Sequence, residues 1–386
     1  MKSIPACGVL ALTCIITGCV THAPEIQSED PKHLYESLRS HCSSAGERQF
    51  CFEKGVVAVA GTDGPETSVK VLQFLLASET DLDKKDYHDL VHRIGRETAK
   101  TFGITTDSFL LCPVDFNYGC QHGFFEQALV TEPDARTAAL TICDPSLMRD
   151  KPEKSLFYCF HGVGHGVLMA KAYRLVPSLE LCDSFPHEDM RRGCWQGVFM
   201  ENVNGVMGGA AQERTFSDDD LLAPCSTLPE KYRWECYINH AGYLVPKTAS
   251  VERATRECLR EPGLSKRACL QSIGLMATNV SWQRGLTALR NGTFIQNAVD
   301  ICVRFPEGYE EDCIEAGVDN LANFDRGDTA RMLAFCENVP DQWRKTCYGT
   351  IGRAVRNELP TNADTKAACT SVPDAYYVVC IDAATR

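Results

Sequence analysis

The stretch CDSFPHEDMRRGCWQGVFMEN, residues 182–202, shows the unit from which most of the chain is built. Pro186 comes four residues after Cys182, and a second cysteine, Cys194, follows eight residues after that proline. Proline is favoured where a helix begins, because its missing N–H has no helical partner there, and acidic residues suit the positive end of the helix dipole. The pattern therefore predicts a helix that begins at the proline and carries the second cysteine about two turns further on.

The same pattern, Cys-x2-[apolar or Glu]-Pro with a second cysteine 11 or 12 residues after the first, occurs six times. An amphipathic segment precedes each first cysteine, and two of these segments open with the helix-capping residues Ser250 and Asp328. Each unit is therefore predicted to be a helical hairpin with a disulfide between its two helices. The predicted disulfides are Cys182/Cys194, Cys225/Cys236, Cys258/Cys269, Cys302/Cys313, Cys336/Cys347 and Cys369/Cys380.

Three looser cysteine pairs come before these six, and the sequence leaves their pairing open: Cys42/Cys51, Cys112/Cys120 and Cys143/Cys159. The second cysteines recur at a mean spacing of about 37 residues, which is typical of two-helix repeats. Counting back by this period places a cysteine-free unit at about 60–98. We therefore expect an all-α fold, an α-solenoid-like array of about ten disulfide-linked helical hairpins. A compact all-α protein whose disulfides join more distant cysteines is the alternative.

The first 18 residues are predicted to be a secretory signal. Lys2 is followed by no charged residue until Glu25, and the apolar run between them is too short and too broken to span a membrane. The run ends in ITGC, residues 16–19, which resembles the lipobox of bacterial lipoproteins. This resemblance implies that Cys19 is lipidated after cleavage. An ordinary signal peptide or a single N-terminal anchor helix is the alternative.

By the same resemblance, the mature protein is tied to the bacterial cell envelope through its N-terminal lipid. Val20 rather than Asp follows the cysteine, which in that family favours the outer membrane, with the protein facing the periplasm or the cell surface. The polar, proline-containing residues 19–33 are predicted to be a tether. Helical repeats would then occupy 34–205 and 206–386.

The composition of the chain argues against several classes of partner and cofactor. The net charge of −12 and the lack of basic blocks argue against a nucleic-acid partner. Of 21 cysteines, Cys7 and Cys14 leave with the signal and Cys19 takes the lipid, so 18 remain. An even number in an exported protein predicts disulfides. The chain has no clustered CxxC spacing and no CxxCH motif, which argues against iron–sulfur clusters and covalent haem.

Five of the ten histidines gather in the early half of the array. They occur in YHDLVHRIG, CQHGFFE and CFHGVGHG, as His88, His92, His122, His161 and His165. Residues four apart lie on the same face of a helix, and equivalent helices of a solenoid line one surface. The five imidazoles are therefore predicted to converge. Glycines three residues after Cys120, Cys159 and Cys194 indicate close helix contact or ligand access.

Converging imidazoles predict a site for a divalent transition metal such as Zn, Cu, Fe or Mn. Glu126 and Glu201 are candidates for a further ligand or a catalytic general base. The alternatives for the five histidines are a buried hydrogen-bonded network without metal, and metal-free acid–base chemistry or ligand binding. His240, alone in YINHAGY, is expected to be a packing residue. No HExxH, GxSxG, Walker or dinucleotide motif is present.

Three functions are consistent with these features. The first is an exported metalloenzyme, hydrolytic or oxidative, and a second is capture or sensing of metal at the cell surface. The third is a non-catalytic envelope scaffold that binds a protein, peptide or glycan on the surface of the solenoid.

Overall fold

A computed structural model describes residues 29–43, 47–79, 87–116, 118–148, 155–207, 215–279, 293–325, 329–359 and 361–385. Within these ranges the protein contains 20 α-helices and one short 3-10 helix, and no strand. The predicted all-α fold is confirmed. The proposed signal, Cys19 and most of the tether lie outside the described residues.

The helices follow one another as hairpins. The first five units are α1 (Pro31–Cys42) with α2 (Arg48–Thr62), α3 (Pro65–Ser78) with α4 (Tyr87–Phe102), α5 (Thr106–Leu110) with α6 (Gly119–Thr131), α7 (Ala135–Ile142) with α8 (Ser155–Ala170), and α9 (Leu175–Asp183) with α10 (Glu188–Met207). The 3-10 helix Pro145–Met148 lies between α7 and α8. The cysteine-free hairpin is the second unit, close to its predicted position.

Five later units follow, and four of them continue the same plan. They contain α11 (Glu230–Tyr237) and α12 (Ala241–Thr248), α13 (Val251–Cys258) with α14 (Gly263–Ala277), α16 (Phe294–Val303) with α17 (Glu310–Asp325), α18 (Ala330–Asn338) with α19 (Asp341–Glu358), and α20 (Asn362–Cys369) with α21 (Asp374–Thr385). The two series together make ten units, as the cysteine spacing predicts.

Nine disulfides tie the units, and each joins neighbouring cysteines. The six predicted pairs are confirmed, as Cys182–Cys194, Cys225–Cys236, Cys258–Cys269, Cys302–Cys313, Cys336–Cys347 and Cys369–Cys380. The three looser pairs also close within their own units, as Cys42–Cys51, Cys112–Cys120 and Cys143–Cys159. A disulfide that closes a loop of this size stabilises the fold by about 3 kcal/mol in the chain-entropy model.

The second cysteine of a pair does not always lie two turns into its helix, as the pattern predicts. Cys236 lies near the end of the second turn of α11, which begins at Glu230, and Cys347 has the same place in α19. Cys313 differs, because it lies only one turn into α17. Gly308, at φ 85°, turns the chain before this helix and delays its start, so the prediction is wrong for Cys313.

The start of the second helix also differs slightly from the prediction in other units. Pro229, Pro262 and Pro340 are N-cap residues with extended ψ angles, so the helix begins one residue later than the sequence indicates. The fixed φ of proline suits this position as well, and the Pro340 carbonyl accepts a hydrogen bond from the first turn of α19. Ser250 caps α13 as predicted, by accepting from the Arg253 N–H. Asp328 lies outside the described residues.

The sixth unit departs from the helical-hairpin plan. Cys225 lies in a run of turns over residues 221–227 rather than at the end of a helix. Pro224 stands immediately before it, and a proline there would break any helix that ended at this cysteine. The second helix is also interrupted, since α11 ends at Tyr237 and α12 begins at Ala241.

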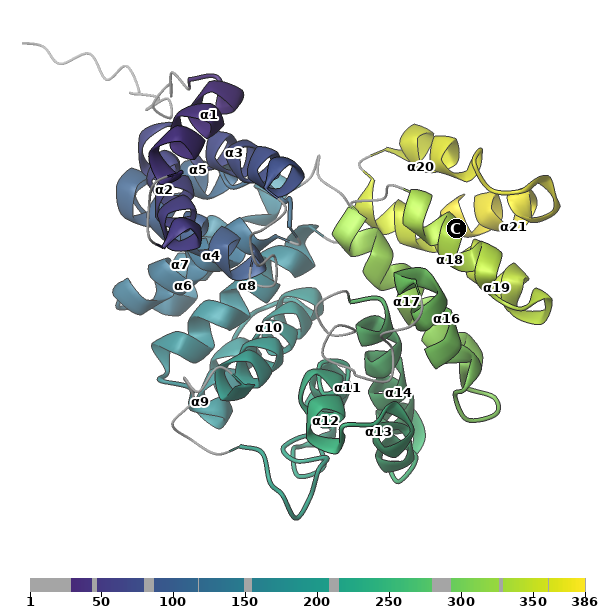
Figure 1. Cartoon of the computed structure of the whole chain (residues 1–386). Coiled ribbons are helices and arrows are strands. Elements are labelled where there is room, and N and C mark those ends of the chain that lie inside the picture. Colours follow the sequence, from purple (N-terminus) through teal and green to yellow (C-terminus); the bar gives the residue numbers. More distant parts are fainter. Residues whose placement is uncertain are drawn as a thin grey trace, which may run out of the picture.

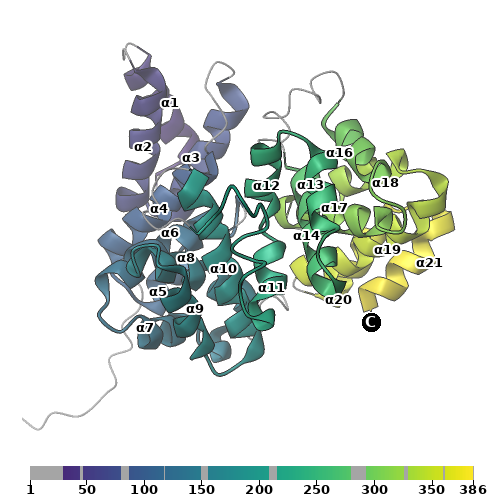
Figure 2. The same cartoon turned by 90° about the horizontal axis from the view of Figure 1, so that it is seen from below.

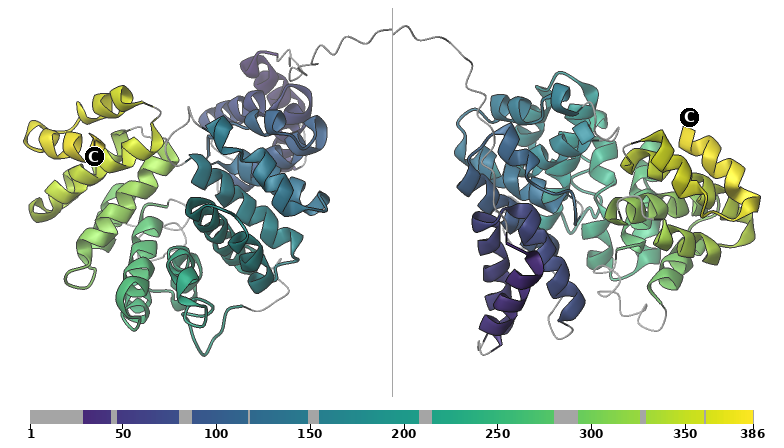
Figure 3. Two further views of the ribbon diagram at one scale, coloured as in Figure 1. Left: turned by 180° about the vertical axis from the view of Figure 1, so that it is seen from behind. Right: turned by 90° about the horizontal axis from the view of Figure 1, so that it is seen from above.

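The second helices pack one on the next along the whole chain. The order is α2, α4, α6, α8, α10, α11, α14, α17, α19 and α21, with each helix in contact with the following one. Figure 1 shows that this stack curves, so that the N-terminal helices and the C-terminal helices face each other across the molecule. The view from behind shows the same curvature (Figure 3, left).

One side chain joins the two facing arms of the curve. The hydroxyl of Tyr158 on α8 lies 2.6 Å from Oδ1 of Asn323 on α17 and 2.9 Å from Oε1 of Glu358 on α19. In the view from below, α8 lies in the N-terminal block, and α17 and α19 in the C-terminal block (Figure 2). Among the described helices, none combines the length and the apolar character that crossing a membrane requires.

Candidate metal centre

Three consecutive second helices bring the five histidines together. Helix α4 carries His88 and His92, α6 carries His122, and α8 carries His161 and His165. The His122 ring contacts the other four, with centroid distances of 4.7 to 5.9 Å. Four of the rings are buried, and His88 is partly exposed. The predicted convergence of the imidazoles is confirmed.

Glycines let the backbones of these helices touch. A Cβ atom on Gly123 of α6 would lie 1.8 Å from the carbonyl oxygen of His92 on α4. A Cβ atom on Gly197 of α10 would lie 1.9 Å from the carbonyl oxygen of His161 on α8. Close helix contact, one of the two roles expected for these glycines, is therefore present, and it brings the imidazoles of adjacent helices within reach of one ion.

In the first histidine pair, His88 and His92, one nitrogen of each ring donates a hydrogen bond. His88 Nδ1 donates to the carbonyl oxygen of Phe116 over 2.9 Å, because a carbonyl can only accept. His92 Nδ1 donates to Oε1 of Glu126 over 2.5 Å. The two Nε2 atoms then lie 2.9 Å apart, and in two neutral rings both would carry a lone pair. A cation bound by both nitrogens would stabilise that arrangement.

The second pair repeats the same geometry. His161 Nδ1 lies 3.0 Å from Oε1 of Gln196, and His165 Nδ1 lies 3.0 Å from Oε2 of Glu201. The two Nε2 atoms are 3.2 Å apart. Metal-binding histidines in proteins typically donate their other N–H to a carboxylate or a carbonyl in this way.

His122 lies between the pairs without a partner of its own. It is 2% exposed, and no described residue forms a hydrogen bond with either of its ring nitrogens. Burial, followed by the neighbouring histidines, lowers the pKa of His122 well below its usual value, so the ring is neutral. Leaving a buried polar group unpaired costs about 1–3 kcal/mol. A bound ion would remove this cost, since imidazole nitrogen is a common ligand of transition metals.

The remaining oxygens of the two carboxylates are also engaged. Oε2 of Glu126 accepts from Arg96, and Oε1 of Glu201 accepts from the hydroxyl of Tyr173 over 2.7 Å. Burial opposes the ionisation of Glu126, but the adjacent His92 imidazole and the Arg96 guanidinium outweigh it and lower the pKa of Glu126 to about 2. Both carboxylates therefore orient histidines in this structure, and their role as general bases stays a prediction.

Three supporting groups were not found from the sequence. Arg96 lies four residues after His92 on the same helix, so the helical period carried a signal for it. Tyr173 lies in the left-handed turn after α8, and Phe116 contributes only its backbone carbonyl, in a left-handed conformation at φ 54°. Neither of these two had a sequence signal. Backbone conformations of this kind cluster at functional sites.

His240 belongs to a different environment. It is buried, and its Nε2 donates to the carbonyl oxygen of Leu221 over 2.7 Å. The ring stacks with Phe216. This is the packing role expected from the sequence.

Ligand atoms from these side chains gather in three groups, each within 4.8 Å. The groups are His88, His92 and His122; His122, His161 and His165; and Glu126, His165 and Glu201. The buried cluster can therefore hold a metal ion.

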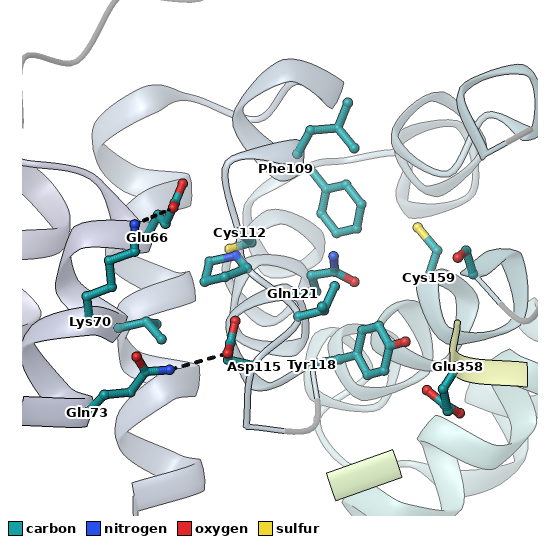
Figure 4. Close-up of a pocket in the computed structure, with 15 residues that line it drawn as sticks. Glu66, Lys70, Gln73, Phe109, Cys112, Asp115, Tyr118, Gln121, Cys159 and Glu358 are labelled. Atoms are coloured by element: carbon teal, nitrogen blue, oxygen red, sulfur yellow. Dashed lines mark hydrogen bonds and ion pairs between the residues drawn. The ribbon is translucent and has the colours of Figure 1, made fainter. Parts of the chain in front are cut away.

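Residues of the α6 region also line a cavity of about 450 Å³. Its wall includes Tyr118 and Gln121 of the α6 region, Phe109 and Asp115, and Glu358 from the C-terminal arm (Figure 4). Gln121 immediately precedes His122, and the loop that contains Phe116 and Asp115 joins the cavity wall to His88. None of the five histidines is among the residues that line the cavity.

No protein-family model, curated protein or solved structure matches this chain. The function of the protein is therefore inferred from the geometry of the site.

Proposed function

We propose that this protein is an exported, lipid-anchored helical-repeat protein whose buried histidine cluster binds a divalent transition metal. The observation that carries the proposal is the use of Nδ1 in four histidines. Each of these nitrogens is held by an acceptor, so that a neutral ring would keep its lone pair on Nε2, and the Nε2 atoms of each pair lie 2.9 and 3.2 Å apart. His122 adds two further nitrogens that have no partner among the described residues.

The donor set favours Zn or Cu among the metals considered. Imidazole nitrogen suits Zn, Cu and Fe, whereas Mn prefers carboxylate oxygen. Glu126 and Glu201 are both engaged by histidine Nδ1 atoms, so the direct ligands are nitrogen. In this proposal the two carboxylates orient the ligands and strengthen their basicity.

The anchoring part of the proposal is supported by the lipobox-like ITGC at residues 16–19 and by the nine disulfides. Cys19 would carry the lipid and hold the protein on the envelope membrane. Mass spectrometry of the mature N-terminus tests this directly. A Cys19→Ser variant that remains in the membrane fraction contradicts it.

A metalloenzyme is a second candidate function, and the cavity favours it. Its wall includes Gln121, which immediately precedes the cluster residue His122 on α6. Hydrolytic and oxidative substrates can be screened with the metal-loaded protein, using Gln121→Trp to fill the cavity while leaving every histidine in place. Turnover that this variant does not reduce argues against the cavity as the substrate site.

The metal proposal is tested by elemental analysis of protein expressed with export. We expect the wild type to retain Zn or Cu after dialysis and His122→Ala or His161→Ala to retain much less. His240→Gln is the matched control, because this buried histidine lies outside the cluster and should leave the metal content unchanged. Wild-type protein that holds no metal after loading and dialysis contradicts the proposal.

A further inference from the structure

The histidine cluster consists of two halves that share one residue. His88 and His92 form the first half with His122, and His161 and His165 form the second half with the same His122. The ligand atoms lie within 4.8 Å of one another in each half. Three nitrogen ligands are enough for a zinc or copper site that keeps one position for water or substrate.

The first half has its own supporting groups. His92 is fixed by Glu126, and His88 is fixed by the Phe116 carbonyl. A carboxylate on one histidine and a neutral acceptor on the other leave the two Nε2 atoms, 2.9 Å apart, available to one ion when both rings are neutral. The negative charge of Glu126 also offsets part of the charge of a bound cation.

The second half repeats this arrangement with different residues. Glu201 takes the place of the carboxylate on His165, and Gln196 takes the place of the neutral acceptor on His161. Neither half borrows a supporting group from the other. Each is therefore equipped to bind an ion by itself.

The distances within each half fit chelation of one ion. Two nitrogens bound at about 2.0–2.1 Å in a tetrahedral site lie about 3.3 Å apart. The Nε2–Nε2 distances are 2.9 Å for His88/His92 and 3.2 Å for His161/His165. Each pair thus needs an adjustment of only a few tenths of an ångström to hold an ion.

His122 is placed to serve both halves. Its ring centroid lies 5.3 Å from that of His92 and 5.1 Å from that of His161. Both of its ring nitrogens are buried and have no hydrogen-bond partner among the described residues, unlike the Nδ1 atoms of the other four histidines. A single metal would use one of these nitrogens and leave the other unpaired.

We infer that the cluster is a dinuclear centre, in which each half binds one divalent transition-metal ion and His122 bridges the two ions as an imidazolate. One ring nitrogen of His122 binds each ion, and the N–H proton of this ring is released to solvent when the second ion binds. This inference rests on the proposed metal-binding function and adds to it the number of ions and the bridging ligand.

The first test is the number of ions bound by the full-length protein after titration with Zn²⁺ and dialysis. We expect two per chain for the wild type and for His240→Gln. The double variants His88→Gln/His92→Gln and His161→Gln/His165→Gln should each bind one, because each removes the chelating pair of one half. Far-UV circular dichroism identifies the variants that have folded.

The second test examines the bridge with Cu²⁺. Two Cu²⁺ ions joined by an imidazolate couple antiferromagnetically, so the integrated electron paramagnetic resonance signal should fall well below that of two free spins. In His122→Ala loaded with two equivalents of Cu²⁺, the coupling should disappear.

The outcomes separate the two proposals. One Zn²⁺ per wild-type chain overturns the dinuclear centre and leaves the metal-binding function intact, whereas no bound ion overturns both. Two ions with an uncoupled Cu²⁺ spectrum overturn the bridging role of His122. A folded double variant that still binds two ions, or that binds none, contradicts the assignment of one ion to each half.

Discussion

Replacing Gly123 by alanine should force helices α4 and α6 apart and weaken the metal site. The new Cβ would lie 1.8 Å from the His92 carbonyl oxygen, whereas real Cβ atoms keep at least 3.0 Å from such an atom. The helices must therefore separate locally by about 1.2 Å, far beyond the tolerance of about 0.2 Å for metal–ligand distances. We expect a net loss of about 1–3 kcal/mol of stability from overpacking, reduced by the better helix propensity of alanine.

Metal affinity should fall by at least about tenfold in the same variant, since lesser changes around metal ligands cost 10–100-fold. Competition with a chromogenic chelator measures this affinity, and urea denaturation measures stability. Two control variants separate the causes. Gly352→Ala places a Cβ 2.0 Å from the Cys380 carbonyl oxygen, far along the chain from the histidines, and should lose stability but keep its affinity. Gly61→Ala meets its nearest atom at 3.4 Å and should be neutral or slightly more stable.

If Gly123→Ala binds metal as tightly as the wild type, the close contact between α4 and α6 is not required for the metal site. The same conclusion follows if Gly352→Ala loses metal affinity to the same extent as Gly123→Ala, because the loss would then reflect general destabilisation.

Three further predictions concern stability. Burial lowers the pKa of His240 to about 4, so between about pH 6.5 and 4 only the unfolded chain gains a proton on this residue. Acidification over this range should therefore lower the free energy of unfolding by up to about 3 kcal/mol. His240→Gln should flatten the dependence of the urea unfolding free energy on pH, and an unchanged slope contradicts this. Replacing both Cys258 and Cys269 by alanine should lower the unfolding free energy by about 3 kcal/mol, and an unchanged urea midpoint would show that this disulfide constrains little. Zn²⁺ at 100 times its dissociation constant should stabilise the wild type by about 2.7 kcal/mol for each ion bound. EDTA should reverse this, and an equal response in His122→Ala would place the ion elsewhere.

The hairpin array could be predicted because its determinants are local. A cysteine, a proline four residues later and a second cysteine at a fixed spacing define the turn, the helix start and the disulfide within a single unit. The disulfide of the sixth unit was predicted correctly, but the helix expected to end at Cys225 was not, because Pro224 immediately before this cysteine would break such a helix. The curvature that brings Tyr158 to Asn323 and Glu358 also had no sequence signal, since it accumulates from small rotations between successive units.

The convergence of the histidines followed from the helical period and the repeat. The orientation of each ring did not, because it depends on partners that the period does not reveal. Glu126 and Glu201 were predicted as ligands or bases, yet the structure shows them holding His92 and His165. A hydrogen bond to a backbone carbonyl, such as that of Phe116, cannot be predicted from residue types, because every residue carries this group.

Every disulfide among the described residues joins a cysteine to the next one along the chain. A polypeptide that enters an oxidising compartment from its N-terminus therefore presents each thiol with its correct partner before any competitor arrives. In a fully reduced chain that is oxidised all at once, any two cysteines can pair, and even eight cysteines allow 105 pairings. Vectorial oxidation should thus yield native protein without an isomerase, whereas refolding from the reduced state should scramble.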